Sequence, residues 1–497
     1  MYAIFVDSLG AVISRRADRC SSSQIHMLNE TNMIGRGGAA GSGGIGMNDG
    51  RFSRALRRYH QFQAAVGAQP EAFYCRSQAL FEGFRGSPKE ANRSTLWSKT
   101  KEWGVAIILA LVSIFTLLRV RANKLATVHY LIDIKNSDNV YDRRSEYVLQ
   151  ILPPEQTINF FHVHHPRNVF SSWSERSNPV YFESLWMVAR VFISKKNAKK
   201  RAEPNGLAEE YKSAWRDQCV REVESERQAQ FWQRVFRWLR VERLVCLDDA
   251  RHTGELRLAC QREGIETIAY MHARFNEHQV GLAQPRFDRY LTWSEFFRDV
   301  LYELNPEYKK SRVTVCGYPK VIPLNKTMRN TEPPLRVMWL GDPKIDSTEL
   351  DPYVEALAGM EHVAVTYRGK PGYEGDIPYK LPAAACWDID ETPDFFESLR
   401  VNGIEVVVGT HSTALMECWL VGVPAIMIRC SYDYAWGLVE SGAIEGCVDA
   451  REFPRQILKL SDMGEEKLEQ RRKKLWGDQP EWSSDRLHQW LNLTTRA

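Results

Sequence analysis

The residues with the clearest chemical potential follow an apolar run late in the chain. The run IEVVVGT at 404–410 leads directly into His411, Ser412 and Thr413, and a helix is expected over 412–421. Backbone N–H groups at the start of a helix have no partner within the helix, and together with the helix dipole they favour an anion. The two hydroxyls could add donors, so the segment is a candidate pyrophosphate site.

Three further side chains could serve the same ligand. Glu417 lies one turn into the expected helix, where a carboxylate can accept hydrogen bonds from two ribose hydroxyls, although a solvated position is the alternative. Arg368 and Lys370 come at and just past the end of the apolar run at 362–369, where cations can meet a diphosphate. Two surface cations in a loop are the alternative for this pair.

Candidate proton acceptors occur in the middle of the chain. His272 ends the run IETIAYMH, and a histidine at a strand end can take the proton of an acceptor hydroxyl. Arg274 and Glu277 follow in the same loop and could bind substrate. Asp249, at the end of RLVCLDD, is a rival base. A structural histidine and a helix-capping aspartate are the alternatives that stay open.

The elements that must position these residues alternate between short apolar strands and helices. Strands are expected at 125–134, 156–163, 243–249, 265–272, 287–293, 312–317, 335–341, 362–369, 404–410 and 424–430. A long helix is expected at 207–240, and shorter helices around 348–358, 393–401 and 412–421. This alternation predicts an α/β fold with parallel sheets covered on both faces. A polar linker with two prolines at 325–334 separates two such domains, at 124–325 and 335–460.

The rest of the chain is less regular. Residues 1–102 include the Gly-rich run 35–46 and are expected to be a largely disordered extension. Residues 103–123 form a hydrophobic helix, for which a short signal anchor, a membrane-surface helix and a buried helix are all open. Residues 461–497 are expected to form a C-terminal helical tail.

Composition limits the classes of function. With 66 basic and 62 acidic residues the net charge is only +4, which does not suggest a dedicated nucleic-acid binder. The ten cysteines include no CxxC pair, and no metal-binding signature is found, so we expect no metal site and no resident cofactor. Buried thiols in a reducing compartment are the simpler interpretation.

Segment 404–430 resembles the donor-site signature of GT-B glycosyltransferases, in which a strand leads into a helix start of small residues, then Glu, then Gly-x-Pro. It is also similar to CDP-glycerol glycerophosphotransferases, bacterial polysialyltransferases, other surface-polysaccharide glycosyltransferases and UDP-N-acetylglucosamine 2-epimerases. Residues 265–281 resemble the Q-H-G turn of these families, and 289–320 resemble their strand, helix and G-x-P turn. The resemblance implies two Rossmann-like domains facing across a cleft, the GT-B architecture, with an irregular N-terminal extension.

The resemblance also implies an activity. A glycosyltransferase of the EC 2.4 class would move a sugar from a nucleotide-activated donor to a surface glycan or glycolipid, with His272 or Asp249 as base. Arg368, Lys370, His411, Ser412, Thr413, Glu417, Arg274 and Glu277 would bind substrate. A CDP-glycerol-type phosphotransferase, a UDP-sugar 2-epimerase and a non-catalytic scaffold are the alternatives. We expect a cytoplasmic protein, with attachment to the cytoplasmic face of a membrane left open by the hydrophobic helix.

Overall fold

The structure is a computed structural model. It describes residues 50–85, 96–123, 127–133, 145–149, 151–152, 157–162, 178–193, 201–247, 253–271, 278–282, 286–320, 322–323, 333–342, 345–370, 379, 387–481 and 483. The chain divides into two compact units, Met1–Asn48 and Asp49–Ala497, and every described residue belongs to the second. The Gly-rich run at 35–46 lies outside the described residues.

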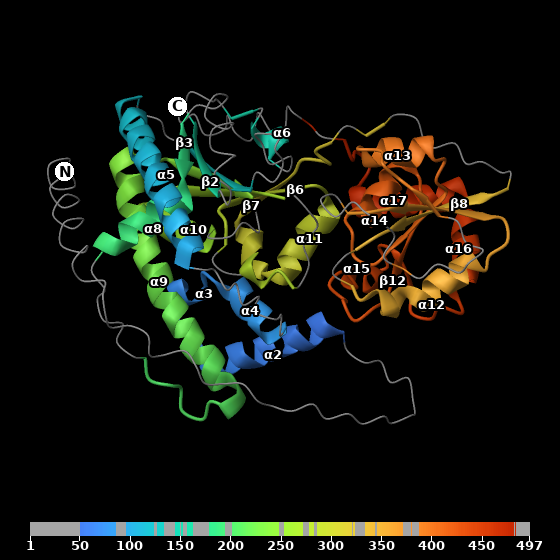
Figure 1. The fold of residues 1–497 in the computed structure, drawn as a ribbon, viewed down its shortest axis with the longest axis horizontal. Helices are drawn as coiled ribbons and strands as arrows, with labels where there is room; N and C mark the ends of the chain where they lie inside the picture. Colours follow the sequence, from blue (N-terminus) through green and yellow to red (C-terminus); the bar gives the residue numbers. More distant parts are fainter. Residues whose placement is uncertain are drawn as a thin grey trace. The chain divides into compact units, whose positions relative to one another are not determined.

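The first sheet has seven parallel strands in the order β3-β2-β1-β4-β5-β6-β7 (Figure 1). The strands are β1 Thr127–Asp133, β2 Thr157–His162, β3 Pro179–Tyr181, β4 Arg243–Leu247, β5 Glu266–Tyr270, β6 Arg289–Thr292 and β7 Arg312–Val315. Strands β2 and β3 lie on one side of β1, whereas β4, β5, β6 and β7 lie on its other side. The topological switch point therefore lies between β1 and β4, which is where open α/β sheets bind ligands.

Helices cover the first sheet because its central strands are apolar along their length. The helical elements are α6 Glu146–Leu149, α8 Phe182–Phe192, α9 Glu209–Leu239, α10 Thr253–Glu263, η2 Val280–Leu282, α11 Glu295–Leu304 and η3 Pro306–Lys310. In α9, Trp232 and Phe236 are fully buried against Phe160 of β2. The helix ends at Arg240, which adopts the left-handed conformation, close to the expected end of this long helix.

The second sheet has six parallel strands in the order β10-β9-β8-β11-β12-β13. They are β8 Leu335–Leu340, β9 Val363–Arg368, β10 Trp387–Ile389, β11 Val406–Gly409, β12 Ala425–Ile428 and β13 Glu445–Cys447. Its helices are α12 Ser347–Ala358, α13 Phe395–Val401, α14 Ala414–Glu417, η4 Cys418–Val421, α15 Gly437–Glu440, α16 Phe453–Ser461 and α17 Glu465–Trp476. The prediction of two α/β domains with parallel sheets is confirmed.

The N-terminal extension differs from the sequence prediction of disorder up to residue 102. It contains α2 Arg51–Val66, α3 Glu71–Tyr74 and α4 Ser77–Arg85. One face of α2 is buried, through residues at helical spacing: Phe52, Ala55, Tyr59, Phe62 and Val66. These side chains form a separate core with Phe73, Phe81 and, from α9, Tyr211 and Trp215. Burial of these aromatic side chains offsets the backbone entropy that is lost when the helices form.

The N-terminus of α2 is capped from the far end of the chain. The carboxylate of Asp433 accepts hydrogen bonds from the backbone amides of Phe52, at 2.7 Å, and Ser53, at 3.2 Å, and from the Ser53 hydroxyl. The preceding residue, Gly50, has no side chain that could cap the helix, and a Cβ there would collide with Asp433. The helix start therefore depends on a carboxylate that lies 381 residues away in sequence.

The hydrophobic segment forms part of α5 Leu96–Asn123, which packs beside α8 and against the edge strand β3. Ser113 accepts a hydrogen bond from the backbone amide of Tyr181 at 2.8 Å. Leu117 and Val120 join the main core. By length and composition Trp103–Arg121 could cross a membrane, but 39% of its apolar window is buried inside the protein.

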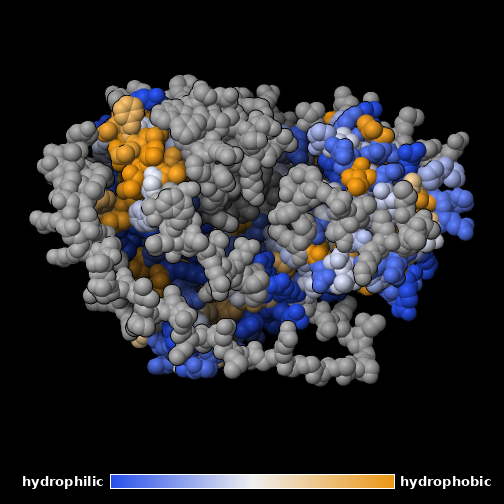
Figure 2. Space-filling model, in the orientation of Figure 1, coloured by the Kyte–Doolittle hydropathy of each residue, from blue (hydrophilic) through white to orange (hydrophobic). Residues whose placement is uncertain are grey.

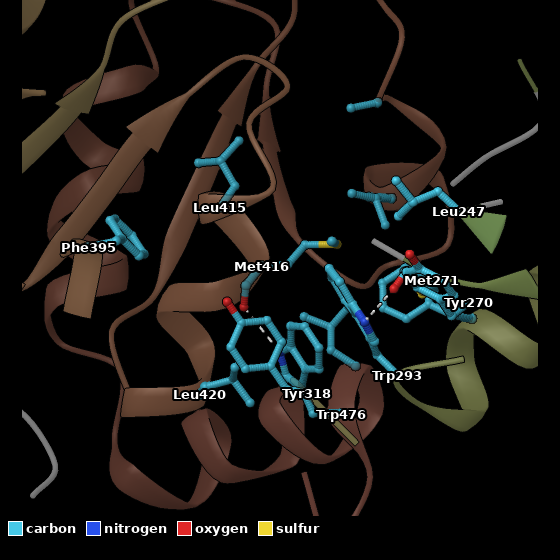
Figure 3. Packing of buried hydrophobic residues seen from close by; sticks show 14 of the residues in the cluster. Leu247, Tyr270, Met271, Trp293, Tyr318, Phe395, Leu415, Met416, Leu420 and Trp476 are labelled. Atoms are coloured by element: carbon cyan, nitrogen blue, oxygen red, sulfur yellow. Dashed lines mark hydrogen bonds between the residues drawn. The ribbon is translucent and has the colours of Figure 1, made fainter. Parts of the chain in front are cut away.

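Residues of both sheets meet around Trp476, the last residue of α17 (Figure 3). Its ring packs on Trp293, Phe297 and Tyr318, and its indole N–H donates to the Met416 carbonyl at 3.1 Å. Trp293 and Tyr318 follow strands of the first sheet, whereas Met416 belongs to α14 of the second domain. The helix α17 thus packs on the first domain through Trp476, and most of the predicted tail beyond it lies outside the described residues.

Replacing Trp476 with Ala removes a side chain that is 1% exposed together with its hydrogen bond. We expect a loss of about 3–5 kcal/mol in the free energy of unfolding, measured by urea denaturation. Leu458→Ala is the matched control, since that side chain is 49% exposed and its loss should cost less than about 0.5 kcal/mol. Equal midpoints for the two variants would contradict the role given to Trp476.

Removing the distant cap by Asp433→Ala should cost about 1–2 kcal/mol, a typical value for loss of a helix cap. Hydrogen exchange should quicken first in α2, because its initial amides lose their acceptor. Asp449→Ala serves as control, because Asp449 bonds only locally, to Arg451. Unchanged protection of α2 in the Asp433 variant would show that the cap is dispensable.

Candidate functional site

The second sheet carries a buried polar pair at its switch point, between β8 and β11. Asp342 comes two residues after β8 and His411 two residues after β11. The imidazole Nε2 lies 2.6 Å from the Asp342 Oδ2, and the two side chains are only 8% and 7% exposed. Buried ionisable groups occur where they are paired, and the carboxyl ends of parallel strands are where open α/β sheets bind ligands. The pair therefore marks the candidate site.

The surroundings fix the orientation of His411. Its Nδ1 lies 3.3 Å from the hydroxyl of Thr410, and its ring packs against that of Tyr432 with centroids 4.4 Å apart. Both ring nitrogens thus have polar neighbours and one ring face is covered. Because Nε2 faces a carboxylate, the pair becomes an ion pair when the imidazole is protonated. A histidine held in this way can supply a positive charge to a neighbouring ligand.

Aromatic residues of the loop after β12 enclose the pair on one side. Tyr432 and Tyr434 pack edge-on against Phe52, the first buried residue of α2. Phe52 also packs against His278, which belongs to the first domain and whose Nδ1 lies 3.2 Å from the Tyr434 carbonyl. The N-terminal extension thus contributes an aromatic wall beside the candidate site.

The helix expected at 412–421 is shorter than predicted. The α-helical part is only Ala414–Glu417, and Cys418–Val421 continues as a 3₁₀ turn. The Ser412 hydroxyl accepts the Ala414 amide at 3.3 Å, so Ser412 caps this turn. A one-turn helix has little macrodipole, so the expected attraction of an anion by a helix dipole is weak here. Ser412 and Thr413 are nevertheless partly exposed beside His411.

Glu417 is drawn into a structural contact. Its carboxylate accepts a hydrogen bond from the Tyr318 hydroxyl at 2.7 Å and lies 3.8 Å from the Lys320 ammonium group. Burial, and then the charge of Glu417, raise the pKa of Tyr318 far above its ordinary value, so the hydroxyl stays a donor. Glu417 thus joins the Gly317–Pro319 turn of the first domain to the second sheet. This contact uses one oxygen of the carboxylate for which a ribose was predicted.

Arg368 is also engaged within the protein. Its guanidinium group pairs with the carboxylate of Asp390 and donates to the carbonyls of Thr392, at 2.8 Å, and Pro393, at 3.3 Å. The side chain is 12% exposed and that of Asp390 is 1% exposed. These bonds hold the loop that leads into α13. Substituting Arg368 would therefore disturb the fold as well as any ligand contact.

Lys370 is the less committed of the two predicted cations. It follows β9 by two residues, as Asp342 follows β8, and the two strands pair with Leu340 opposite Arg368. Within the described part of the chain its ammonium group has no hydrogen bond or ion pair, and the residue is partly exposed. A solvated cation at the carboxyl edge can meet phosphate oxygens at little desolvation cost.

The four acceptor-side predictions all fall outside the described residues. These are His272, Asp249, Arg274 and Glu277. The residue before His272 is well fixed, because its carbonyl accepts two hydrogen bonds. The Met271 carbonyl accepts one from the Trp293 indole at 3.1 Å (Figure 3) and one from the Tyr147 hydroxyl at 2.6 Å. The loop that carries His272 thus starts from a rigid point at the end of β5.

Asp342 and Tyr432 are not among the site residues predicted from the sequence. Asp342 had a usable signal, because it follows the apolar run LRVMWLG as His411 follows IEVVVGT. Side chains just past two neighbouring parallel strands meet at one edge of the sheet. Tyr432 had no such signal, since its contact with His411 depends on the path of a loop. No cluster of three or more metal-ligating side chains occurs among the described residues.

No family model matches the chain, and no curated protein matches it. Among solved structures, the calicheamicin glycosyltransferase CalG4 has a TM-score of 0.45 at 11% identity, covering 75% of this chain and 99% of that one. The glycosyltransferase SnogD from Streptomyces nogalater has a TM-score of 0.42 at 11% identity, covering 70% and 95%. The UDP-GlcNAc 2-epimerase from Neisseria meningitidis bound to UDP-GlcNAc has a TM-score of 0.39 at 9% identity, covering 74% and 99%.

Likeness at this level carries no argument about activity. The class of the protein follows from its own sheets: it has two α/β domains, each with a parallel sheet in the Rossmann strand order and with a switch point at the carboxyl ends. A buried Asp–His pair occupies the switch point of the second sheet.

The Asp390 carboxylate gives a testable pH dependence. Burial alone would raise the pKa of Asp390, but hydrogen bonds from Ser398, Thr392 and Arg368 outweigh burial and lower the pKa below its ordinary value. The resulting stabilisation is present above the unfolded-state pKa and is lost as the pH falls through the lower folded-state pKa.

Asp390→Asn should therefore lower the free energy of unfolding by about 3 kcal/mol at neutral pH, as expected for breaking a buried ion pair. The difference from the unmodified chain should shrink between about pH 5 and pH 3, measured by urea denaturation. Asp346→Asn is a control with an exposed helix-capping carboxylate. If the loss in free energy of unfolding of Asp390→Asn did not change with pH, the stabilising role given to the ionised Asp390 carboxylate would be wrong.

Proposed function

We propose that the protein is a glycosyltransferase that binds a nucleotide-activated sugar at the carboxyl end of the second sheet. The observation that carries the proposal is the buried Asp342–His411 pair at the β8/β11 switch point. Strands there are apolar along their length, so a paired, buried aspartate and histidine just past them have no part in the packing of the sheet. Two Rossmann-type domains in one chain suit a reaction between a nucleotide donor and a separate acceptor.

The donor's diphosphate is assigned to the cations and donors at this edge. Lys370, partly exposed and without a partner in the described residues, supplies a mobile positive charge. The hydroxyls of Ser412 and Thr413 lie next to His411 in sequence and are accessible. Arg368 and Glu417 contribute by holding the neighbouring loops through Asp390 and Tyr318. These supporting roles for Arg368 and Glu417 differ from the sequence prediction, in which both side chains contact the donor directly.

His411 has an electrostatic role in this proposal. When the glycosidic bond to the donor breaks, negative charge develops on the leaving diphosphate. A protonated imidazole held by Asp342, together with Lys370, would balance that charge without a metal ion. A fixed positive group in a partly buried site favours the charged transition state more than the same group in water does. Asp342 acts here as a positioning residue.

The acceptor side is assigned to the first sheet. His272 or Asp249 takes the proton of the acceptor hydroxyl, which attacks the anomeric carbon as the nucleotide leaves. The fixed Met271 carbonyl supports a defined start for the loop of His272. A surface glycan or glycolipid, met at the cytoplasmic side, is the proposed acceptor, and nucleic acid is not proposed as a partner.

A thermal-shift series with UDP, CDP, GDP, dTDP and CMP tests the donor site. One nucleotide should raise the melting temperature, since a ligand at about 100 times its Kd adds roughly 2.7 kcal/mol to stability. Lys370→Ala and His411→Gln should each weaken that nucleotide by about tenfold, the value of one charge-assisted hydrogen bond. The absence of a shift with every nucleotide would refute the donor site.

Controls separate binding from folding and from other reactions. Lys310→Ala removes an exposed lysine paired only with Glu307, so nucleotide affinity should stay unchanged. Melting without ligand reports any loss of fold in His411→Gln. With the bound sugar nucleotide identified, conversion of the sugar in the absence of acceptor would indicate an epimerase, and a phosphodiester product would indicate phosphotransfer. Either result would show that the reaction is not the proposed glycosyl transfer.

A further inference from the structure

Helix α5 carries a continuous apolar stripe that the fold leaves uncovered. Six large side chains on it are exposed: Trp103 38%, Ile107 44%, Ile108 60%, Leu111 53%, Phe115 71% and Leu118 43%. Their spacing places them along one side of the helix. Figure 2 shows this apolar surface over α5. Other exposed large apolar residues of the described chain, such as Val401 and Val448, are scattered and need no partner.

The opposite side of α5 belongs to the first domain. Leu109 packs with Phe161 and Tyr181, and Ala110, Leu117 and Val120 lie in the main core. The Ser113 hydroxyl accepts the amide of Tyr181 in the edge strand β3 and donates to the Leu109 carbonyl at 2.7 Å. A helix that crosses a bilayer would have to detach from the first domain, which would expose the apolar residues beneath it and the edge strand β3 to water. The packing therefore opposes a spanning position.

The charges around the stripe are mainly positive, although Glu102 directly precedes Trp103 and Glu224 pairs with Arg190 at 3.8 Å. From Trp103 to Asn123 the sequence contains no Asp or Glu, and Arg119 and Arg121 follow the stripe directly. Lys99 and Lys101 belong to the beginning of the same helix. On the neighbouring helix α8, exposed Arg190 precedes exposed Val191 and Phe192. Long cationic side chains beside an apolar ridge can reach the headgroups of anionic lipids.

We infer that α5 is an interfacial helix: it lies in the plane of a bilayer that contains anionic phospholipid and buries this stripe among the acyl chains while its other side stays in the protein. A continuous apolar ridge that ends in Trp103 and is flanked mainly by cations suits the acyl chains and headgroups of a bilayer with anionic lipid. The inference does not depend on the proposed transfer reaction.

Vesicle flotation of the full chain tests the inference. The protein should bind vesicles of phosphatidylcholine with phosphatidylglycerol and bind pure phosphatidylcholine vesicles more weakly, and added salt should reduce the difference. Ile108→Ser combined with Phe115→Ser should lower the partition coefficient at least about tenfold, because two apolar side chains no longer leave water. Alkaline carbonate should release the bound chain, because a helix that lies in the interface is not anchored across the bilayer.

Val401→Ser combined with Val448→Ser is the matched control, since these side chains are 58% and 63% exposed on the second domain. Vesicle binding should not change in this control, and melting temperatures of all three proteins should agree. Failure of the unmodified chain to float would overturn the inference, as would resistance to carbonate extraction. If light scattering instead shows a dimer that the stripe variant dissociates, without vesicle binding, a second copy of the chain covers the stripe.

Discussion

The structure depends on one constraint, namely that apolar parallel strands must be covered on both faces. Strands such as Val406–Gly409 and Ala425–Ile428 are buried at every residue, so polar side chains have room only past their ends. In the second sheet these ends bring Asp342 and His411 to within 2.6 Å of each other, although 69 positions separate them in the sequence. The polar pair of the candidate site therefore lies where the buried strands end.

The same constraint explains what the sequence could predict. Runs such as RLVCLDD and IEVVVGT predict strands, and alternation with helices predicts the two parallel sheets that are observed. The same runs place Arg368, Lys370 and His411 at or just past the ends of strands, which is where the structure has them. The partners of those side chains were not predictable, because Arg368 pairs with Asp390 across a loop and Glu417 with Tyr318 of the other domain. Such contacts between residues far apart in the sequence depend on the path of the folded chain, so no pattern in the nearby sequence predicts them.

In the N-terminal extension the sequence prediction was of disorder, whereas the structure has helices from residue 51 to residue 85. Its Gly-rich run dominates the composition and predicts disorder, yet the apolar residues from Phe52 to Val66 recur at helical spacing and bury one face of α2. The residue before this helix offers no cap in the sequence, and the cap comes from Asp433 in the loop that also carries Tyr432 and Tyr434. Periodicity was the better signal than composition, because burial of one face decides whether a helix forms.

Helix α5 has one side buried in the first domain and another side that is apolar but exposed. A helix that is apolar on all sides is expected to be surrounded by protein or by lipid. Here one side is fixed by Ser113, Leu117 and Val120 to the sheet, so the domain cannot release it without exposing the edge strand β3. The remaining side is then available at no cost to folding. Substitutions at Phe115 or Ile108 change only the exposed side, so they test the inferred membrane attachment without disturbing the buried side of the helix.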